Sequence, residues 1–85
     1  MQIQFSETAW SQLNEWLTTD RKTFARIQAL IADTTREPFS GIGKPELLKH
    51  NLSGYWSRRI DSENRLIYRV NNDVLEIIAC RGHYK

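Results

Sequence analysis

Residues 55–81 read YWSRRI-DSEN-RLIYRV-NND-VLEIIACR, three apolar-rich runs separated by two short polar turns. Runs of this length that are rich in β-branched and aromatic residues are typical of β-strands. We therefore predict strands at residues 55–60, 65–70 and 74–81, joined by residues 61–64 and by a tighter turn at Asn71-Asn72. Strands joined by such short turns pair in an antiparallel sheet.

The sequence before this stretch predicts one strand and two helices. Ile3 and Phe5 alternate with polar neighbours, as in a short strand, and Ser6 and Asp20 are suited to cap the helices that follow. Apolar residues recur at helical spacing in both helices: Trp10, Leu13, Trp16 and Leu17, then Phe24, Ile27, Leu30 and Ile31. Because isolated helices of this length are marginal in water, we expect both to cover the sheet.

A loop and a helical turn should connect the helices to the strands. Residues 37–45 hold both prolines and two of the four glycines, which predicts a loop. Pro45 is well placed to start a short helical turn over residues 46–50, with Asn51 or Gly54 ending it. The predicted fold is a single α+β domain over residues 1–85, ordered β-α-α-β-β-β, with the helices packed on one face of a small, mainly antiparallel sheet.

Composition excludes several classes of protein. Apolar residues make up 40% of the 85 residues and aromatics 11%, too much for a disordered chain. No stretch is apolar enough for a membrane span, and the first residues lack the layout of a signal peptide. The single cysteine, Cys80, lies in an apolar strand as a buried residue would, and it allows no intrachain disulfide, so we expect a cytoplasmic protein. Residues 44–85 hold eight Lys and Arg against five Asp and Glu, a modest indication of a polyanionic partner.

Strand alternation divides the arginines between the two faces of the sheet. Leu66 and Tyr68 share one face, which the helices should cover, and Arg65 lies on the other. If Trp56 points into the core, Arg59 joins Arg65 on the open face. Two such guanidinium groups form a phosphate-sized cationic site.

The same alternation does not fit Arg58, and the arginines of the open face also have an alternative interpretation. Arg58 would point with the core residues, so we place it at a sheet edge, snorkelling or paired. The arginines of the open face could instead form ordinary surface pairs with the acidic residues of neighbouring strands and turns, namely Glu63, Asp73 and Glu76.

The C-terminal tail carries a histidine and an aromatic ring, His83 and Tyr84, where chains usually fray. If both converge with Glu46, Arg59 and Arg65, the set suits cleavage of RNA through its own 2′-hydroxyl, which needs a base, an acid and cations. Tyr84 could stack on a splayed base. Glu46 also has an ordinary interpretation, as an acidic residue in the first turn of a helix.

A metal site is the remaining combination of these side chains. Glu46, His50, His83 and Cys80 could supply ligands, but their spacing matches no recognised metal motif. We therefore expect no metal and no cofactor, and we interpret His50 as structural.

Five longer blocks of sequence carry a further signal: Lys44-Pro45-Glu46, Leu48-Lys49-His50-Asn51-Leu52-Ser53-Gly54, Trp56-Ser57-Arg58-Arg59-Ile60, Arg65-Leu66-Ile67-Tyr68 and Cys80-Arg81-Gly82-His83-Tyr84. In these blocks the chain resembles the YoeB (Txe) toxins of the RelE/ParE superfamily, and the likeness spans nearly the whole chain. The resemblance implies a RelE/ParE-like, microbial ribonuclease-like version of the predicted fold. It also implies a bacterial type II toxin that enters the ribosomal A site and cuts mRNA there without a metal.

The resemblance assigns roles by position. It implies that Glu46 is the general base, His83 the general acid and Arg65 the main stabiliser of the phosphate. It gives substrate or phosphate binding to three further residues: Lys49, Arg59 and Tyr84. The implied partners are mRNA on the ribosome, ribosomal RNA and a YefM-type antitoxin, with a homodimer as a further candidate assembly.

Two departures and two rival functions qualify this interpretation. Leu47 stands where relatives often have proline, which should make the turn at Glu46 more regularly helical, and Lys85 extends the chain beyond the usual His-Tyr ending. One rival is a non-catalytic, ParE-like inhibitor of DNA gyrase on the same fold, and the other is an RNA-binding protein that blocks the ribosome without cutting.

Overall fold

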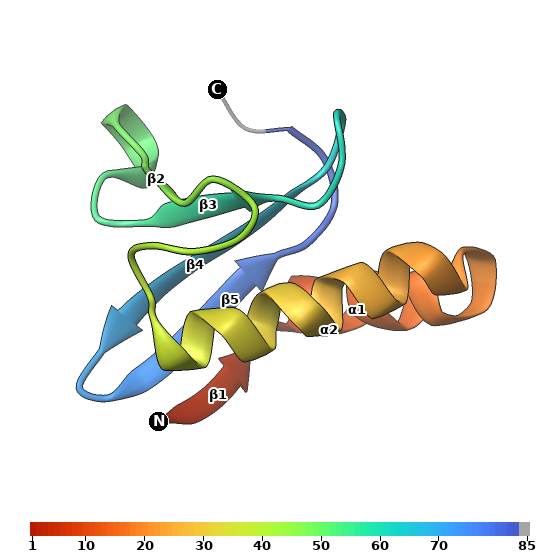
Figure 1. The fold of residues 1–85 in the computed structure, drawn as a ribbon, viewed down its shortest axis with the longest axis horizontal. Helices are drawn as coiled ribbons and strands as arrows, with labels where there is room; N and C mark the ends of the chain where they lie inside the picture. The colour runs from red at the N-terminus through yellow and green to blue at the C-terminus, as the bar shows by residue number, and fades with distance from the viewer. Residues whose placement is uncertain (84–85) are drawn as a thin grey trace.

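A computed structural model describes residues 1–83 of the chain as two helices against one five-stranded sheet (Figure 1). The elements in chain order are β1 (Gln2–Phe5), α1 (Glu7–Thr19), α2 (Arg21–Arg36), β2 (Glu46–Leu47), the 3-10 helix η1 (His50–Leu52), β3 (Trp56–Arg59), β4 (Arg65–Asn71) and β5 (Val74–Ala79). The strand order is β1-β5-β4-β3-β2, with β1 parallel to β5 and the other pairs antiparallel. The predicted α+β fold is confirmed, with one strand more than expected.

The two helices begin at the predicted caps. The Ser6 side chain accepts a hydrogen bond from the Ala9 N–H at 3.0 Å, and the Asp20 carboxylate accepts one from the Thr23 N–H at 3.2 Å. Each bond satisfies a backbone donor that a helix N-terminus otherwise leaves unpaired. Asp20 also ends α1, so the connection between the helices is a single residue, and the helices lie side by side in Figure 1.

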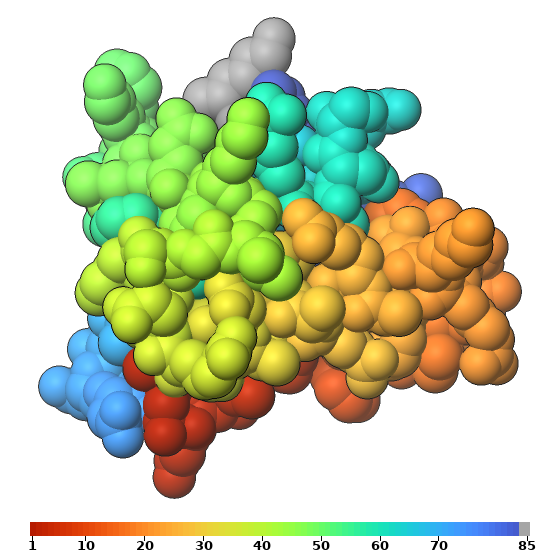
Figure 2. Space-filling model, viewed as in Figure 1, coloured from red at the N-terminus to blue at the C-terminus, as the bar shows by residue number. Residues whose placement is uncertain are grey.

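The core lies between the helices and one face of the sheet, as the alternation predicts. Ile27 and Leu30 of α2 are fully buried against Leu66 and Tyr68 of β4. Side chains that leave water in this way supply most of the favourable free energy of folding. The helices and the loop after α2 cover the sheet in the view of Figure 2.

The segment after the loop is a strand and not the predicted helical turn. Glu46 pairs with Ser57 of β3, and Leu48 donates its N–H to the Tyr55 carbonyl at 2.8 Å. The helical turn comes later, at His50–Leu52. The prediction for residues 46–50 was wrong because the free edge of β3 offers backbone hydrogen bonds that a local helical turn cannot match. Leu47 therefore lies in an extended segment, and the expected effect of its replacing proline does not arise.

The turn between β4 and β5 is displaced by one residue from the prediction. Both Asn72 and Asp73 have positive φ, 51° and 62°, as a two-residue type I′ hairpin turn requires. The predicted turn at Asn71-Asn72 was therefore one residue too early, and Asn71 closes β4 opposite Val74.

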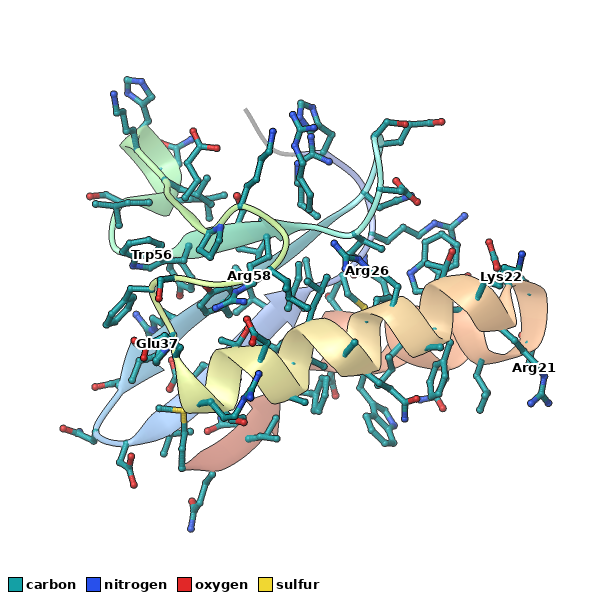
Figure 3. All side chains as sticks on the ribbon, viewed as in Figure 1. Arg21, Lys22, Arg26, Glu37, Trp56 and Arg58 are labelled. Carbon is teal, nitrogen blue, oxygen red and sulfur yellow. The ribbon has the colours of Figure 1, made fainter. Side chains whose placement is uncertain are left out.

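Arg58 is the largest buried side chain and lies inside the fold, not at a sheet edge (Figure 3). Its guanidinium donates to five oxygens, which belong to the Tyr68 hydroxyl, the Asp33 carboxylate and the carbonyls of Glu37, Ser40 and Ile42. The predicted pairing is correct, but the predicted edge position was wrong because the loop carbonyls satisfy the charge in the interior. Arg58 thus fastens residues 37–42 to α2 and the sheet.

No helix among the residues described is both long and apolar enough to cross a membrane.

Replacement of Arg58 by alanine should lower the free energy of unfolding by about 3–5 kcal/mol, because it leaves Asp33 and the loop carbonyls without their buried donor. Urea unfolding followed by tryptophan fluorescence measures this change. Arg36→Ala is the matched control, since Arg36 contacts the same Asp33 carboxylate at 2.6 Å but its side chain is 77% exposed. Equal effects of the two changes would contradict the anchoring role of Arg58.

Low pH should remove the contribution of the Asp33 carboxylate to the free energy of unfolding. The hydrogen bond from Arg58, and then that from the Ile42 N–H, hold the pKa of Asp33 below its ordinary value of 3.8. A pKa lowered by folding stabilises the protein above the unfolded-state pKa, and this contribution is lost as the pH falls through the folded-state pKa. The difference in unfolding free energy between wild type and Asp33→Asn should therefore be constant above about pH 5 and shrink below about pH 4. A difference that does not change with pH would contradict this assignment.

Candidate functional site

The open face of the sheet carries two cross-strand rows of side chains. Glu46 of β2 lies opposite Ser57 of β3, which lies opposite Ile67 of β4. Two pairs further along, and so on the same face, Arg59 of β3 lies opposite Arg65 of β4. Residues directly opposite in an antiparallel pair point to the same face, about 4.5–5.5 Å apart. The register therefore brings a carboxylate and two guanidinium groups onto one surface.

A cleft of about 400 Å³ opens on this surface. Its lining residues are Glu46, Leu47, Leu48, Lys49, His50, Leu52, Ser57, Arg59, Arg65 and His83. Five of the six predicted site residues line it, and the sixth, Tyr84, lies outside the described residues. The structure thus brings these five residues together from residues 46–52, β3, β4 and the tail.

Arg65 is held at the base of the cleft without a carboxylate partner among residues 1–83. The residue is only 9% exposed, and its Nη1 donates to the Asp61 carbonyl at 2.7 Å and the Asn64 carbonyl at 3.1 Å. These carbonyl oxygens orient the guanidinium, and no carboxylate among residues 1–83 forms an ion pair with it, although the charge of Asp61 acts on it from the neighbouring turn. Arg65 is therefore available to bind an anion.

Arg59 lies beside Arg65 and is exposed. Its backbone N–H donates to the Gly43 carbonyl at 2.6 Å and its carbonyl accepts from Arg26 of α2 at 3.3 Å, so the loop and α2 both hold the backbone of β3 here. Figure 3 shows Arg26 near this end of β3. Neither Arg59 nor Arg65 forms an ion pair with another described residue.

The acidic residues of the alternative interpretation are engaged elsewhere or lie apart. Glu76 pairs with Arg69, and Asp73 lies 3.9 Å from the N-terminal amine. Glu63 forms no ion pair within residues 1–83. Ordinary surface pairing therefore does not account for Arg59 and Arg65.

The tail is tied to α1 before it reaches the cleft. The Cys80 N–H donates to Gln12 Oε1 at 2.8 Å, and the Cys80 carbonyl accepts from Trp16 Nε1 at 2.9 Å. Arg81 lies over the Trp16 ring and 3.2 Å from Glu15. These bonds direct the chain from β5 along the start of β4, and Figure 1 shows this segment and β2 at the same end of the molecule. His83 follows directly and its side chain is exposed at the cleft.

The other wall of the cleft comes from the segment around η1. Lys49 precedes η1, and His50 begins it with a positive φ of 59°. We interpreted His50 from the sequence as structural, yet its side chain is exposed and lines the cleft. The sequence analysis did not include Ser57, which is 7% exposed and lies at the base of the cleft. The signal for Ser57 was available, because it lies two residues before Arg59 on the same strand.

Cys80 lies apart from this cleft. Its thiol is fully buried against the Ala9 carbonyl, on the helix side of the sheet, and burial raises its pKa to about 11. Such a thiol is a packing residue with little thiolate at neutral pH. Among residues 1–83, no three His, Cys, Asp or Glu side chains are grouped as metal ligands.

The arrangement is suited to chemistry at a phosphate. Glu46 supplies a carboxylate and His83 an imidazole, two groups that can exchange protons. Arg59, Arg65 and Lys49 supply positive charge around the same space, which can bind phosphate oxygens.

Comparison with known proteins identifies the family. The family model for the YoeB-like toxin of bacterial type II toxin-antitoxin systems matches residues 5–84. The chain belongs to this family of toxins. It is 54% identical to Toxin YoeB of Escherichia coli (strain K12) over 84 residues, which cover 99% of this chain and all of that protein.

Solved structures of the YoeB family share the fold closely. A YoeB/ParE toxin from Agrobacterium tumefaciens matches 99% of this chain and all of its own with a TM-score of 0.96 and 43% identity. A Staphylococcus aureus relative at 40% identity, matched over 99% of this chain and 98% of its own, is known in a heterotetrameric YoeB-YefM complex and as a YoeB dimer, with TM-scores of 0.90 and 0.92. The resemblance seen in the sequence and the predicted fold are confirmed, whereas the roles of the individual site residues stay predictions.

Proposed function

We propose that this member of the YoeB family is an endoribonuclease that cuts mRNA in the ribosomal A site by acid and base chemistry without a metal, and so inhibits translation. The observation that carries the proposal is the convergence of Glu46, Arg65 and His83 on one cleft of the open sheet face. Fold alone would not distinguish an enzyme from a binding protein. RNA cleavage requires a carboxylate, an imidazole and cations in one cleft, and these cations have no ion-pair partner among residues 1–83.

The proposed reaction uses the 2′-hydroxyl of the substrate as nucleophile. The Glu46 carboxylate removes the 2′-OH proton while the 2′ oxygen attacks phosphorus. The bond from phosphorus to the 5′ oxygen breaks, and the His83 imidazolium donates its proton to that oxygen. The products are a 2′,3′-cyclic phosphate and a 5′-hydroxyl, so no water and no redox partner is consumed.

The cations act on the charge that develops during this reaction. Arg65 is fixed by two carbonyls, so little reorganisation is needed when it binds the pentacoordinate phosphorane. Arg59 and Lys49 would hold the flanking phosphates or the substrate. Tyr84, which follows His83 in sequence, would stack on a base of the single strand.

The family also indicates the protein partners. The Staphylococcus aureus relative forms a complex with YefM and a dimer, so we infer a YefM-type antitoxin and allow a homodimer for this chain. Because His83 is one residue beyond the last anchored position, an antitoxin would need to displace only the tail to inactivate the enzyme. Because its proposed substrate is mRNA on translating ribosomes, the enzyme would act in the cytoplasm.

A purified translation reaction tests the proposal. With wild-type protein, primer extension should show new mRNA ends at A-site codons, and His83→Ala and Glu46→Gln should each reduce the cleavage rate by about 10²- to 10⁴-fold. Ribosome binding should be largely retained in both variants. Glu63→Gln is the matched control, because Glu63 lies in the nearby turn and does not line the cleft.

Two outcomes would contradict the proposal. Inhibition of translation with intact mRNA would favour a protein that only blocks the ribosome, and inhibition of gyrase without effect on translation would favour a ParE-like activity. If His83→Ala lost binding and cleavage equally, His83 would be a docking residue and not the acid.

A further inference from the structure

The turn between β3 and β4, residues 61–64, contacts both Arg65 and the tail. Its carbonyls at Asp61 and Asn64 accept the guanidinium hydrogen bonds of Arg65. The Asn64 side chain reaches the other way, and its Oδ1 accepts the Gly82 N–H at 2.9 Å. One short turn therefore contacts Arg65 directly and also the residue that precedes His83.

Asn64 is itself fixed by the neighbouring aspartate. Its Nδ2 donates to both oxygens of the Asp61 carboxylate at 3.1 Å, and its backbone N–H donates to Asp61 Oδ1 at 2.8 Å. Because Nδ2 faces Asp61, Oδ1 must face Gly82, so the orientation of the amide is determined. Asn64 thus presents a fixed acceptor to the tail.

Both backbone groups of Gly82, its N–H and its carbonyl, form hydrogen bonds. Its N–H goes to Asn64 Oδ1, and its carbonyl accepts the Arg65 N–H at 2.9 Å. Gly82 has a positive φ of 89°, and a Cβ placed on it would meet no described atom within 4 Å beyond its chain neighbours. The two hydrogen bonds hold the Gly82 backbone on either side of this bend, immediately before His83.

We propose that Asn64 is a positioning residue, which holds the Gly82 backbone so that the imidazole of His83 reaches the leaving oxygen while Arg65 holds the phosphate. This inference rests on the proposed RNA cleavage, with His83 as general acid. Asn64 does not touch the substrate in this account. It acts through Gly82, which donates its N–H to Asn64 Oδ1 and directly precedes His83.

Asn64→Ala removes the acceptor of the Gly82 N–H and the two Nδ2 bonds to Asp61, but the backbone N–H bonds of residues 63 and 64 to Asp61 Oδ1 remain to hold the turn. In the free protein, hydrogen exchange at the Gly82 amide should become faster, while the Ile60 amide, which donates to the backbone carbonyl of residue 64, keeps its protection. The single-turnover cleavage rate on the ribosome should fall by about 10- to 100-fold, since a misplaced acid loses much of its effect. Ribosome affinity should change little.

Ser62→Ala is the matched control in the same turn. The Ser62 side chain makes no hydrogen bond with the described residues, whereas Asn64 and Asp61 hold the turn together. This variant should keep both the Gly82 protection and the cleavage rate. Thermal unfolding of each variant shows whether the turn has merely lost stability.

A modified substrate separates positioning of the acid from general damage to the site. An mRNA with sulfur in place of the bridging 5′ oxygen at the cleavage position has a leaving group that departs without a proton. On this substrate the defect of Asn64→Ala should shrink to less than about threefold, because the function of His83 is no longer needed. A role of Asn64 in stability alone would leave the defect equal on both substrates.

Each outcome decides one claim. If wild-type protein cleaves mRNA but Asn64→Ala cleaves as fast, or shows the same defect on the oxygen and sulfur substrates, the positioning role is wrong and the proposed function stands. If wild-type protein cleaves neither substrate, the proposed function fails. In that case, faster hydrogen exchange at Gly82 in Asn64→Ala would show only that Asn64 holds the Gly82 backbone. Unchanged exchange would show that it does not.

Discussion

Because side chains alternate along β3, its two consecutive arginines point to opposite faces of the sheet. Arg58 points under the loop, where it is fully buried with five oxygen acceptors, and Arg59 points to the open face opposite Arg65. A shift of one residue in the register would bury the site arginine and expose the structural one. The buried guanidinium thus fixes both the loop and the face on which the cations of the site lie.

The site is assembled from segments that are each tied to this framework. The loop pinned by Arg58 leads into β2, whose pairing with β3 places Glu46 opposite Ser57. After β5, hydrogen bonds of Cys80 with Gln12 and Trp16 hold the tail, and the last hydrogen bond of this kind among residues 1–83 is at Gly82. The positions of Glu46 and His83 therefore depend on a few hydrogen bonds, whereas Arg59 and Arg65 lie on strands inside the sheet. Segments held in this way are the natural targets of a partner that inactivates the protein.

Local patterns were enough to predict the helices, their caps and the two faces of the sheet. Ser6 and Asp20 carry recognisable capping chemistry, and the alternation through Leu66 and Tyr68 identifies the core face without knowledge of the partner strands. Arg59 and Arg65 could be placed on one surface by the same reasoning. These features depend on residues near one another in the sequence.

The features that were missed depend on contacts between distant backbone atoms. The strand at Glu46 forms because β3 has a free edge, and Arg58 is buried because carbonyls of residues 37–42 happen to surround it. Backbone carbonyls and N–H groups are present at nearly every residue, so they leave no mark in the sequence. The bond from Gly82 to Asn64 was unpredictable for the same reason.

The central claim is that the cleft cuts RNA through the substrate's own 2′-hydroxyl. An mRNA that carries one 2′-deoxy nucleotide at the cleavage position, placed in the A site of a purified ribosome complex, tests this directly because only the nucleophile is missing. The modified mRNA should bind the toxin–ribosome complex as tightly as unmodified mRNA and should not be cut at the modified position. Cleavage of the deoxy substrate at an undiminished rate would show that water or another nucleophile attacks the phosphate, and would contradict the roles given to Glu46 and His83.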